Sequence, residues 1–208
     1  MDKAIQIVLV DDHPMVVKGL NSCLGEYPEL HVVATMESGE ELLERQEDVV
    51  CDVVLLDVNL PGLGGIDTAR RFLARETETQ VLIFSMLNNP DYARHALDAG
   101  ARGYLLKDAM PDELVTAIKT VAAGGSYFSR DIAASLAKPA ADANNAVLTD
   151  TERAVLGQIA EGKSSKEIAR EAGVSVRTTE AHRRNIKLKL GAQTAAECVQ
   201  IGIRSRLI

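Results

Sequence analysis

The first half of the chain alternates short apolar runs with amphipathic stretches long enough to form helices. Strands that alternate with helices predict a parallel sheet with helices on both faces. Three of the runs are almost unbroken in their apolar character, as strands covered on both faces should be. We therefore expect an α/β fold with a doubly wound, five-stranded parallel sheet, whose strands are Ile5–Val10, His31–Ala34, Val53–Leu56, Val81–Phe84 and Gly103–Leu106.

The pattern changes after Ser126. Residues 131–146 are rich in alanine and contain Pro139, which predicts a short helix followed by a linker. Helical signals return from Leu148 onward. A Ser or Thr with a Glu three residues later predicts a capping box at Thr149, Ser164 and Thr194. Glycines stand where helices should end, at Gly162, Gly173 and Gly191.

These signals divide the chain into an α/β domain at 1–125, a short helix and linker at 126–146, and a small all-α domain at 147–208. In the last domain we expect four helices, at about 150–161, 165–172, 176–190 and 195–206.

Composition and charge narrow the class of protein. With 46% hydrophobic and 25% charged residues, the 208-residue chain has the composition of a globular protein. It has no apolar run long enough to span a bilayer and no signal peptide, so we expect a cytoplasmic location and no membrane partner. Residues 1–130 carry 11 basic and 21 acidic residues, whereas residues 131–208 carry 12 and 9. Only the second part is therefore expected to meet nucleic acid.

Polar residues follow the predicted strands. Asp11 and Asp12 end the first run, Asp57 the third, Ser85 the fourth and Lys107 the fifth. In doubly wound sheets, ligands bind beyond the carboxyl ends of the strands. A single Asp in such a place is more often a helix cap or a turn residue. Five polar residues at one edge predict a binding site instead.

Crowded carboxylates repel one another unless a cation shares them. Mg²⁺ suits this set, because it prefers carboxylate and carbonyl oxygens such as those of Asp11, Asp12, Asp57 and the Asn59 backbone. A carboxylate beside such an ion can attack a phosphoryl donor and form an acyl phosphate. Lys107 and Ser85 could then hold the phosphate oxygens. Because Pro14 follows His13, we interpret that histidine as a helix-entry residue outside the site.

Residues 163–190 predict a helix, a turn at 172–174 and a second helix. The second helix carries five basic residues and a single acidic one. One of its faces should pack, through Thr179, His182, Ile186 and Leu190. The opposite face holds Arg177, Glu180, Ala181, Arg184 and Lys187, and we expect phosphate contacts from Arg183 and Lys189 on the flanks. A charged face is usually only solvated surface. As the second helix of a helix-turn-helix, however, it is expected to enter a DNA major groove.

Four motifs resemble the receiver domain of response regulators: IVLVDDHP, VVLLDVNLPGLGGID, LIFSM and GYLLKD. They occur in order within residues 4–123. The resemblance implies a flavodoxin-like fold. It also implies these roles: Asp57 as phosphoacceptor, Asp11 and Asp12 as the metal-binding pair, Lys107 as the phosphate-pairing lysine, and Ser85 and Tyr104 as switch residues. From the residues alone, Tyr104 could simply be core. Asp108 departs from the proline that many receivers carry there.

The segment LTDTERAVLGQIAEGKSSKEIAREAGVSVRTTEAHRRNIKLKLG resembles the LuxR-type DNA-binding domain. Together with the receiver it resembles the NarL/FixJ family. In that family Glu180, Ala181 and Arg184 correspond to base-facing residues, while Thr179 departs from the usual apolar residue. The implied partners are a sensor histidine kinase, double-stranded promoter DNA, a second copy of the chain on phosphorylation or DNA binding, and RNA polymerase as a further candidate. The last helix serves either pairing or core packing.

The expected function is therefore that of a two-component response regulator, in which phosphorylation of Asp57 by a kinase controls sequence-specific DNA binding and transcription. Three other functions fit less well. Phosphatases of the haloacid dehalogenase type need an acid two residues after the nucleophile, where this chain has Asn59, so we expect at most self-phosphorylation from small donors and slow autodephosphorylation. A quorum-sensing pocket would be apolar and aromatic, but the chain has no Trp. RNA binding lacks a stacking platform, because only 3% of residues are aromatic.

Overall fold

The computed structural model describes residues 4–75, 77–137, 148–192 and 194–208. The chain forms two compact units, Met1–Pro139 and Ala140–Ile208. Residues 138–147, which include the end of the predicted linker, lie outside the described residues. In the part of the chain that is described, no helix combines the length and the apolar character needed to cross a membrane.

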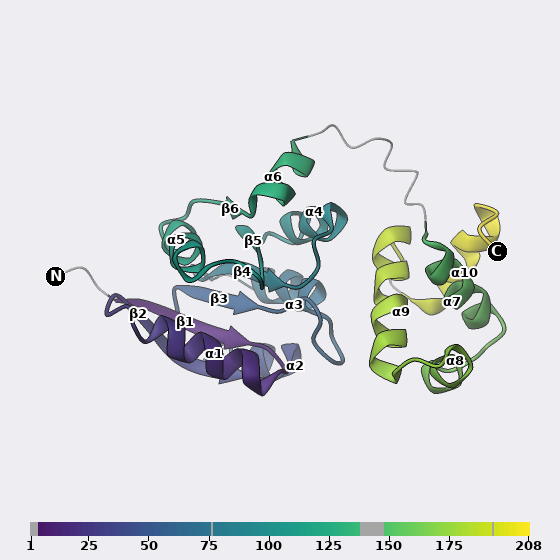
Figure 1. The fold of residues 1–208 in the computed structure, drawn as a ribbon, viewed down its shortest axis with the longest axis horizontal. Helices are drawn as coiled ribbons and strands as arrows, with labels where there is room; N and C mark the ends of the chain where they lie inside the picture. Colours follow the sequence, from purple (N-terminus) through teal and green to yellow (C-terminus); the bar gives the residue numbers. More distant parts are fainter. Residues whose placement is uncertain (1–3, 76, 138–147, 193) are drawn as a thin grey trace. The chain divides into compact units, whose positions relative to one another are not determined.

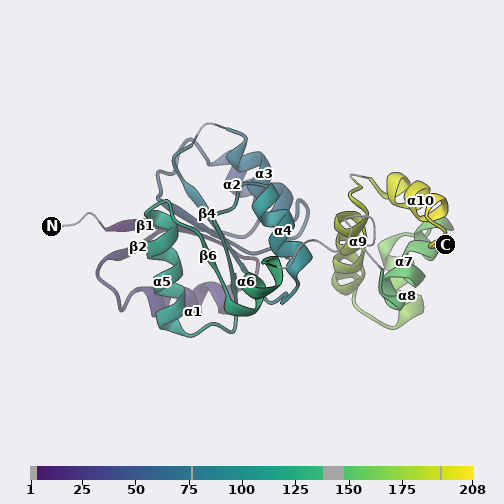
Figure 2. The same cartoon turned by 90° about the horizontal axis from the view of Figure 1, so that it is seen from above.

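The first unit is built on a parallel sheet with the strand order β2-β1-β3-β4-β5-β6 (Figure 1). Its strands are β1 (Ile5–Val10), β2 (Leu30–Met36), β3 (Val53–Leu56), β4 (Gln80–Ser85), β5 (Gly103–Leu106) and β6 (Tyr127–Phe128). Its helices are α1 (Pro14–Leu24), α2 (Gly39–Glu44), α3 (Gly65–Leu73), α4 (Pro90–Asp98), α5 (Pro111–Ala122) and α6 (Arg130–Leu136). In Figure 2, α1 and α5 lie on one side of the sheet, and α2, α3 and α4 lie on the other. The predicted doubly wound parallel sheet is confirmed.

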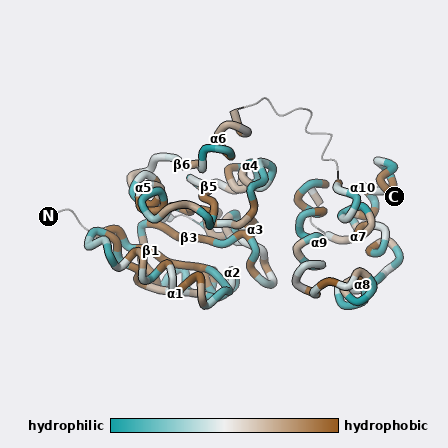
Figure 3. Tube along the Cα trace, in the orientation of Figure 1, coloured by the Kyte–Doolittle hydropathy of each residue, from teal (hydrophilic) through white to brown (hydrophobic). Residues whose placement is uncertain are grey.

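The core of the first unit lies between the strands and these helices. Ile7 and Leu9 of β1 share a buried cluster with Leu24 of α1 and Ile118 of α5. Val8 lies between them in sequence and is equally buried, so it packs toward the opposite helical layer. The strands accordingly form the hydrophobic centre of the unit in Figure 3. Burial on both faces explains why the runs show no alternation in sequence.

The sheet has a sixth strand, which the sequence analysis did not predict. Residues of β6 pair with Gly103 and Tyr104 of β5. The Ser129 N–H continues this pairing by donating to the Tyr104 carbonyl at 3.0 Å, and the Ser129 hydroxyl accepts from the Leu106 N–H at 3.2 Å. A strand of two residues is too short to produce a recognisable pattern of hydrophobic and polar residues in the sequence. Helix α6 then contacts α4 and buries Ile132, so the first unit continues past the predicted boundary at residue 125.

The second unit is helical, with α7 (Asp150–Ala160), α8 (Ser165–Ala172), α9 (Val176–Leu190) and α10 (Ala195–Arg204). The three predicted capping boxes are present, at the starts of α7, α8 and α10. Gly173 and Gly191 end α8 and α9 in the left-handed conformation, as predicted. The core contains Leu156 of α7, Ile168 of α8 and Ile186 of α9. Local capping and end signals thus set the limits of these helices.

One ion pair is buried between α7 and α9. Lys189 Nζ lies 2.7 Å from Glu152 Oε2, and their side chains are only 11% and 4% exposed. Burial alone would raise the pKa of Glu152, but the hydrogen bonds from Lys189 and Thr149 outweigh it and hold the pKa below the ordinary value of 4.5. The charged carboxylate is therefore the form that the folded unit stabilises.

The start of α3 leaves no room for a side chain. A Cβ at Gly65 would lie 1.9 Å from the Asp57 carbonyl oxygen. Gly65→Ala should therefore lower the free energy of unfolding by about 1–3 kcal/mol, the usual cost of overpacking. Gly19→Ala is the control, because Gly19 lies within α1 and a Cβ there meets nothing within 4 Å. It should stabilise the same unit by about 0.5–1 kcal/mol.

Urea titration of the full chain measures both changes. The chain has four tyrosines and no tryptophan, and all four tyrosines lie in the first unit, so tyrosine fluorescence reports the unfolding of that unit alone. Equal midpoints for Gly65→Ala and the wild type would mean that the loop relaxes freely around the added methyl group.

The buried ion pair between Lys189 and Glu152 predicts a larger loss of stability in the second unit. Glu152→Gln leaves the Lys189 ammonium buried without its counter-charge, and removing one partner of a buried pair costs about 3 kcal/mol or more. Hydrogen exchange in α7 and α9 of the full chain should accelerate, while exchange in β1 and β3 stays unchanged. Glu167→Gln is the matched control, because Glu167 holds the same place in the exposed capping box of α8 and should cost less than about 1 kcal/mol.

The sign of the pH dependence follows from the lowered pKa of Glu152. A depressed folded-state pKa contributes stability above the unfolded pKa, and that stability is lost as the pH falls through the folded value. The difference in exchange between wild type and Glu152→Gln should therefore persist at neutral pH and shrink below the ordinary glutamate value of 4.5. A difference that stays constant as the pH falls well below this value would contradict the assignment.

Candidate functional site

The candidate site lies where the strand order of the sheet reverses, between β1 and β3. Asp11 and Asp12 follow β1, and Asp57 follows β3. A hydrogen bond of 2.9 Å from the Asp57 N–H to the Val10 carbonyl fixes the ends of the two strands side by side. Helices leave the sheet in opposite directions at such a point, so a cleft for ligands opens there. The topology therefore brings together the carboxylates that the sequence analysis singled out.

Lys107 joins two of these carboxylates. Its Nζ lies 2.5 Å from Asp11 Oδ2 and 3.0 Å from Asp57 Oδ2. The three side chains are only 7%, 4% and 1% exposed. The Lys107 N–H donates to the Ser85 carbonyl at 2.9 Å, so the strand pairing of β4 and β5 positions the ammonium. Lys107 therefore neutralises part of the negative charge in a site that water scarcely reaches.

The second oxygen of Asp57 is a buried acceptor without a hydrogen bond. Among the described residues, Asp57 Oδ1 has no hydrogen-bond partner. Burial raises the pKa of the Asp57 carboxyl above its usual range, the nearby Asp11 adds to this, and Lys107 offsets only part of it. An acceptor that is desolvated and unpaired is costly unless a ligand satisfies it. Oδ1 is thus an atom that a bound cation or phosphoryl group could use.

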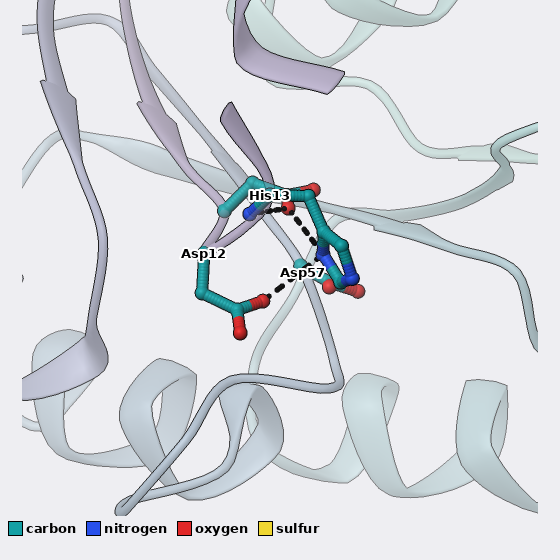
Figure 4. A group of neighbouring side chains, drawn as sticks. Asp12, His13 and Asp57 are labelled. Carbon is teal, nitrogen blue, oxygen red and sulfur yellow. Dashed lines mark hydrogen bonds and ion pairs between the residues drawn. The ribbon is translucent and has the colours of Figure 1, made fainter. Parts of the chain in front are cut away.

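His13 joins the acidic group, although the sequence analysis left it out of the site. Its Nδ1 lies 3.0 Å from Asp11 Oδ1 and 3.0 Å from Asp12 Oδ1. Figure 4 shows the imidazole ring beside the carboxylates of Asp12 and Asp57. Ligand atoms of Asp11, Asp12, His13 and Asp57 all lie within 4.8 Å of one another, which is compact enough for one metal ion. The signal that pointed away from this role was Pro14, which does make His13 the N-cap of α1.

Ser85 and Tyr104 meet at the backbone of one residue. The Leu87 N–H donates to Ser85 Oγ at 3.1 Å, and the Tyr104 hydroxyl donates to the Leu87 carbonyl at 2.8 Å. Both side chains are fully buried, and burial raises the pKa of Tyr104 to about 12. Leu87 takes part through its backbone alone, and backbone contacts of this kind leave no sequence signal. Together these bonds hold the β4–α4 loop at the edge of the site.

Asn59 and Asp108 are the other residues of the first unit that the sequence analysis singled out. Asn59 lies two residues past Asp57, in the β3–α3 loop, and is partly exposed. The role of its carbonyl as a metal ligand stays a prediction. Asp108, which replaces the usual proline, is exposed in the turn after β5.

The face of α9 that the periodicity predicted to pack is buried at two of its four positions. Thr179 and Ile186 are buried, and the Thr179 hydroxyl donates to the Ser175 carbonyl at 3.4 Å, which satisfies its polar group. On the opposite face, Glu180 is exposed, and Arg184 and Lys187 are partly exposed. The side chain of Arg177 lies outside the described residues. The accessible face of α9 therefore carries guanidinium and ammonium groups.

The two flanking cations of α9 have other partners. Lys189 is committed to the buried pair with Glu152, so the predicted phosphate contact of Lys189 is corrected to a structural role. Arg183 Nη1 donates to the Lys163 carbonyl at 3.4 Å, a long bond that leaves its other N–H groups for further contacts. Helical spacing places both residues correctly on the flanks, but it cannot reveal a partner on another helix.

The comparisons with known proteins agree with this geometry. A family model described as "Response regulator receiver domain" matches residues 7–119. A second model, "Bacterial regulatory proteins, luxR family", matches residues 146–201. The transcriptional regulatory protein MctR of Rhizobium johnstonii is 37% identical over 199 residues, which cover 96% of this chain and 93% of MctR. UhpA of Salmonella typhimurium, also a transcriptional regulatory protein, is 39% identical over 193 residues and covers 93% of this chain and 95% of its own.

A solved structure is similar as well. The crystal structure of a LuxR-family two-component response regulator from Aurantimonas sp. SI85-9A1 matches with a TM-score of 0.62 at 36% identity. It covers 65% of this chain and 96% of its own. The family models, the full-length relatives and the fold agree: this chain belongs to the NarL/FixJ response regulators, transcriptional regulators rather than enzymes, in which a receiver domain is joined to a LuxR-type DNA-binding domain.

Proposed function

We propose that Asp57 accepts a phosphoryl group from a sensor histidine kinase and that this modification controls binding of the second unit to promoter DNA. One observation carries the proposal. Asp57 presents a buried carboxylate with one oxygen on Lys107 and the other without a hydrogen-bond partner, at the switch point of the sheet. No other carboxylate among the described residues combines burial, a cationic partner and an unsatisfied oxygen. Asp11 is the most similar carboxylate, but both of its oxygens have partners: Oδ1 accepts from the His13 N–H, and Oδ2 contacts Lys107 Nζ.

The chemistry is a transfer between two covalent bonds. An Asp57 oxygen attacks the phosphorus, a P–O bond forms, and the P–N bond of a phosphohistidine breaks. With acetyl phosphate as the donor, a P–O bond breaks instead. The residue two positions on, Asn59, has no carboxylate to activate water. The resulting acyl phosphate should therefore outlast a catalytic turnover, which suits a signal.

We further propose that Mg²⁺ is held by Asp11, Asp12, Asp57 and the Asn59 backbone carbonyl. The oxygen-rich donor set fits this ion, and the unpaired buried Asp57 Oδ1 offers it an oxygen ligand. When bound, the ion would neutralise the charge of the carboxylates and the incoming phosphoryl oxygens. Lys107 is then available to exchange its bond with Asp57 for one with a phosphate oxygen.

The response would be transmitted through Ser85 and Tyr104. The Ser85 hydroxyl is buried at the site and can donate its proton to a phosphate oxygen, because its present bond to Leu87 uses it as an acceptor. Tyr104 holds the carbonyl of the same Leu87. A phosphoryl group with charge near −2 would thus bias the position of the β4–α4 loop. A bias of a few kcal/mol is enough to shift most molecules between two states.

In the second unit we propose that α9 enters the major groove, with Glu180, Ala181 and Arg184 toward the bases. Arg184 can form a bidentate bond with guanine O6 and N7. Lys187, together with Arg177 and Arg183, would contribute mainly attraction to phosphates. The accessible cations of α9 support this assignment.

A homodimer is the expected assembly on phosphorylation or DNA binding. Helix α10 supports it, because Val199 and Ile201 pack on the domain core while Ile203 is 61% exposed beyond them. An exposed isoleucine beside partly buried apolar neighbours offers apolar surface to a second copy. Within the cytoplasm, RNA polymerase is a further candidate partner of the DNA-bound regulator.

Phosphorylation should occur at Asp57 alone. Acetyl phosphate and Mg²⁺ should give one phosphoryl adduct on the full chain, none on Asp57→Asn and an unchanged adduct on Asp108→Asn. Mass spectrometry counts the adducts. DNA affinity or dimerisation should rise on phosphorylation of the wild type and of the Asp108 variant only.

Two results would contradict the proposal. An adduct that survives Asp57→Asn and maps to another residue would remove Asp57 as the acceptor. If both DNA affinity and dimerisation stay constant over a full phosphorylation titration, phosphorylation does not control the output.

Base contacts and phosphate contacts on α9 should respond differently to mutation. Arg184→Ala should weaken binding to the preferred duplex by about 1–3 kcal/mol and relax the preference at one base pair. Lys187→Ala should weaken all duplexes alike and reduce the salt slope by about 1. Lys18→Ala, which removes a cation from exposed α1 surface, is the charge-matched control and should change neither quantity.

The preferred duplex comes from selection of bound sites out of random DNA with the phosphorylated chain. Binding is then measured on that duplex and on a scrambled one at several salt concentrations. Equal weakening of both duplexes by Arg184→Ala would remove Arg184 as a base reader.

A further inference from the structure

His13 is directed at the acidic group by its own local sequence. A residue before proline is held in the extended region of the backbone, and His13, which precedes Pro14, has φ −102° and ψ 106°. As the N-cap of α1 it makes no side-chain capping bond. Instead its N–H donates to Asp11 Oδ1 at 2.9 Å, and its Nδ1 lies 3.0 Å from both Asp11 Oδ1 and Asp12 Oδ1.

The spacing of these atoms fits the coordination sphere of a small divalent ion. Two neighbouring ligands of an octahedral ion with bonds of about 2.1 Å lie about 3 Å apart. Nδ1 has this separation from one oxygen of Asp11 and one of Asp12. Asp57 completes the group within the 4.8 Å span, and its buried Oδ1 lacks a hydrogen-bond partner. The donor set of the side chains is therefore three carboxylates and one imidazole.

We propose that His13 Nδ1 is a metal ligand and that the site consequently binds first-row ions such as Ni²⁺ more tightly than Mg²⁺. The inference rests on the proposed metal site at Asp57 and adds the nitrogen ligand to it. Oxygen donors alone suit Mg²⁺, whereas an imidazole adds affinity for ions later in the first row. The ring is 46% exposed, so it borders the solvent side from which an ion would enter.

Selectivity between two ions is the measurement that tests this role. The untagged full chain is titrated with Ni²⁺ and separately with Mg²⁺ by calorimetry, at one fixed pH, for the wild type and His13→Gln. Ni²⁺ should bind the wild type more tightly than Mg²⁺ does. His13→Gln should lower the affinity for Ni²⁺ by at least about tenfold, because the loss of even an outer-shell partner of a metal ligand has an effect of this size. Mg²⁺ affinity should change by less than about threefold.

Two control variants complete the design. His31→Gln removes an exposed imidazole from β2 and should leave both affinities unchanged. Asp57→Asn should lower the affinity for both ions, because it removes an oxygen ligand that they share. Circular dichroism verifies that each variant is folded.

The outcomes distinguish failure of this inference from failure of the proposed function. Equal effects of His13→Gln on the two ions, or no effect on Ni²⁺, would overturn the ligand role of His13 while Mg²⁺ binding and phosphorylation at Asp57 stand. Ni²⁺ that binds the wild type no more tightly than Mg²⁺ would also overturn it. If the wild type binds neither ion, the proposed metal site fails, and the role of His13 fails with it.

Discussion

The ammonium of Lys107, held between Asp11 and Asp57, is the interaction on which the first unit depends. Parallel strands all end at the same edge of the sheet, so the topology itself forces the carboxylates together. Like charges in a buried place are tolerated only when a cation shares them. One lysine at the end of β5 meets this need with two contacts at 2.5 and 3.0 Å. The same lysine therefore stabilises the resting site and is positioned to receive a phosphate.

Much of this arrangement could be predicted from the sequence, because it follows from local pattern and topology. Apolar runs indicate the buried strands, and polar residues at their ends lie at one edge once the sheet is parallel. The starts of α7, α8 and α10 follow from capping boxes, in which both partners are three residues apart. Signals of this kind depend on neighbours in the chain and need no knowledge of distant contacts.

The roles that could not be predicted from the sequence share a different origin. The role of Lys189 depends on Glu152, 37 residues away on another helix, and periodicity within α9 cannot reveal that partner. The contact of Leu87 with Ser85 and Tyr104 uses backbone atoms, which have no residue signature. His13 was excluded because Pro14 predicts a helix entry. The entry is real, but the extended backbone that the proline imposes also turns the imidazole toward the acids.

Strand β6 has a consequence for the solubility of the receiver. Without it, the carbonyls of Arg102 and Tyr104 and the N–H of Leu106 would lose the partners that residues 127–129 provide. A row of unpaired backbone groups on an edge strand invites pairing with another chain. A receiver cut at residue 125 would expose such a row along an apolar strand and tend to aggregate. The two residues of β6 and the hydroxyl of Ser129 thus act as a cover that keeps the sheet from growing.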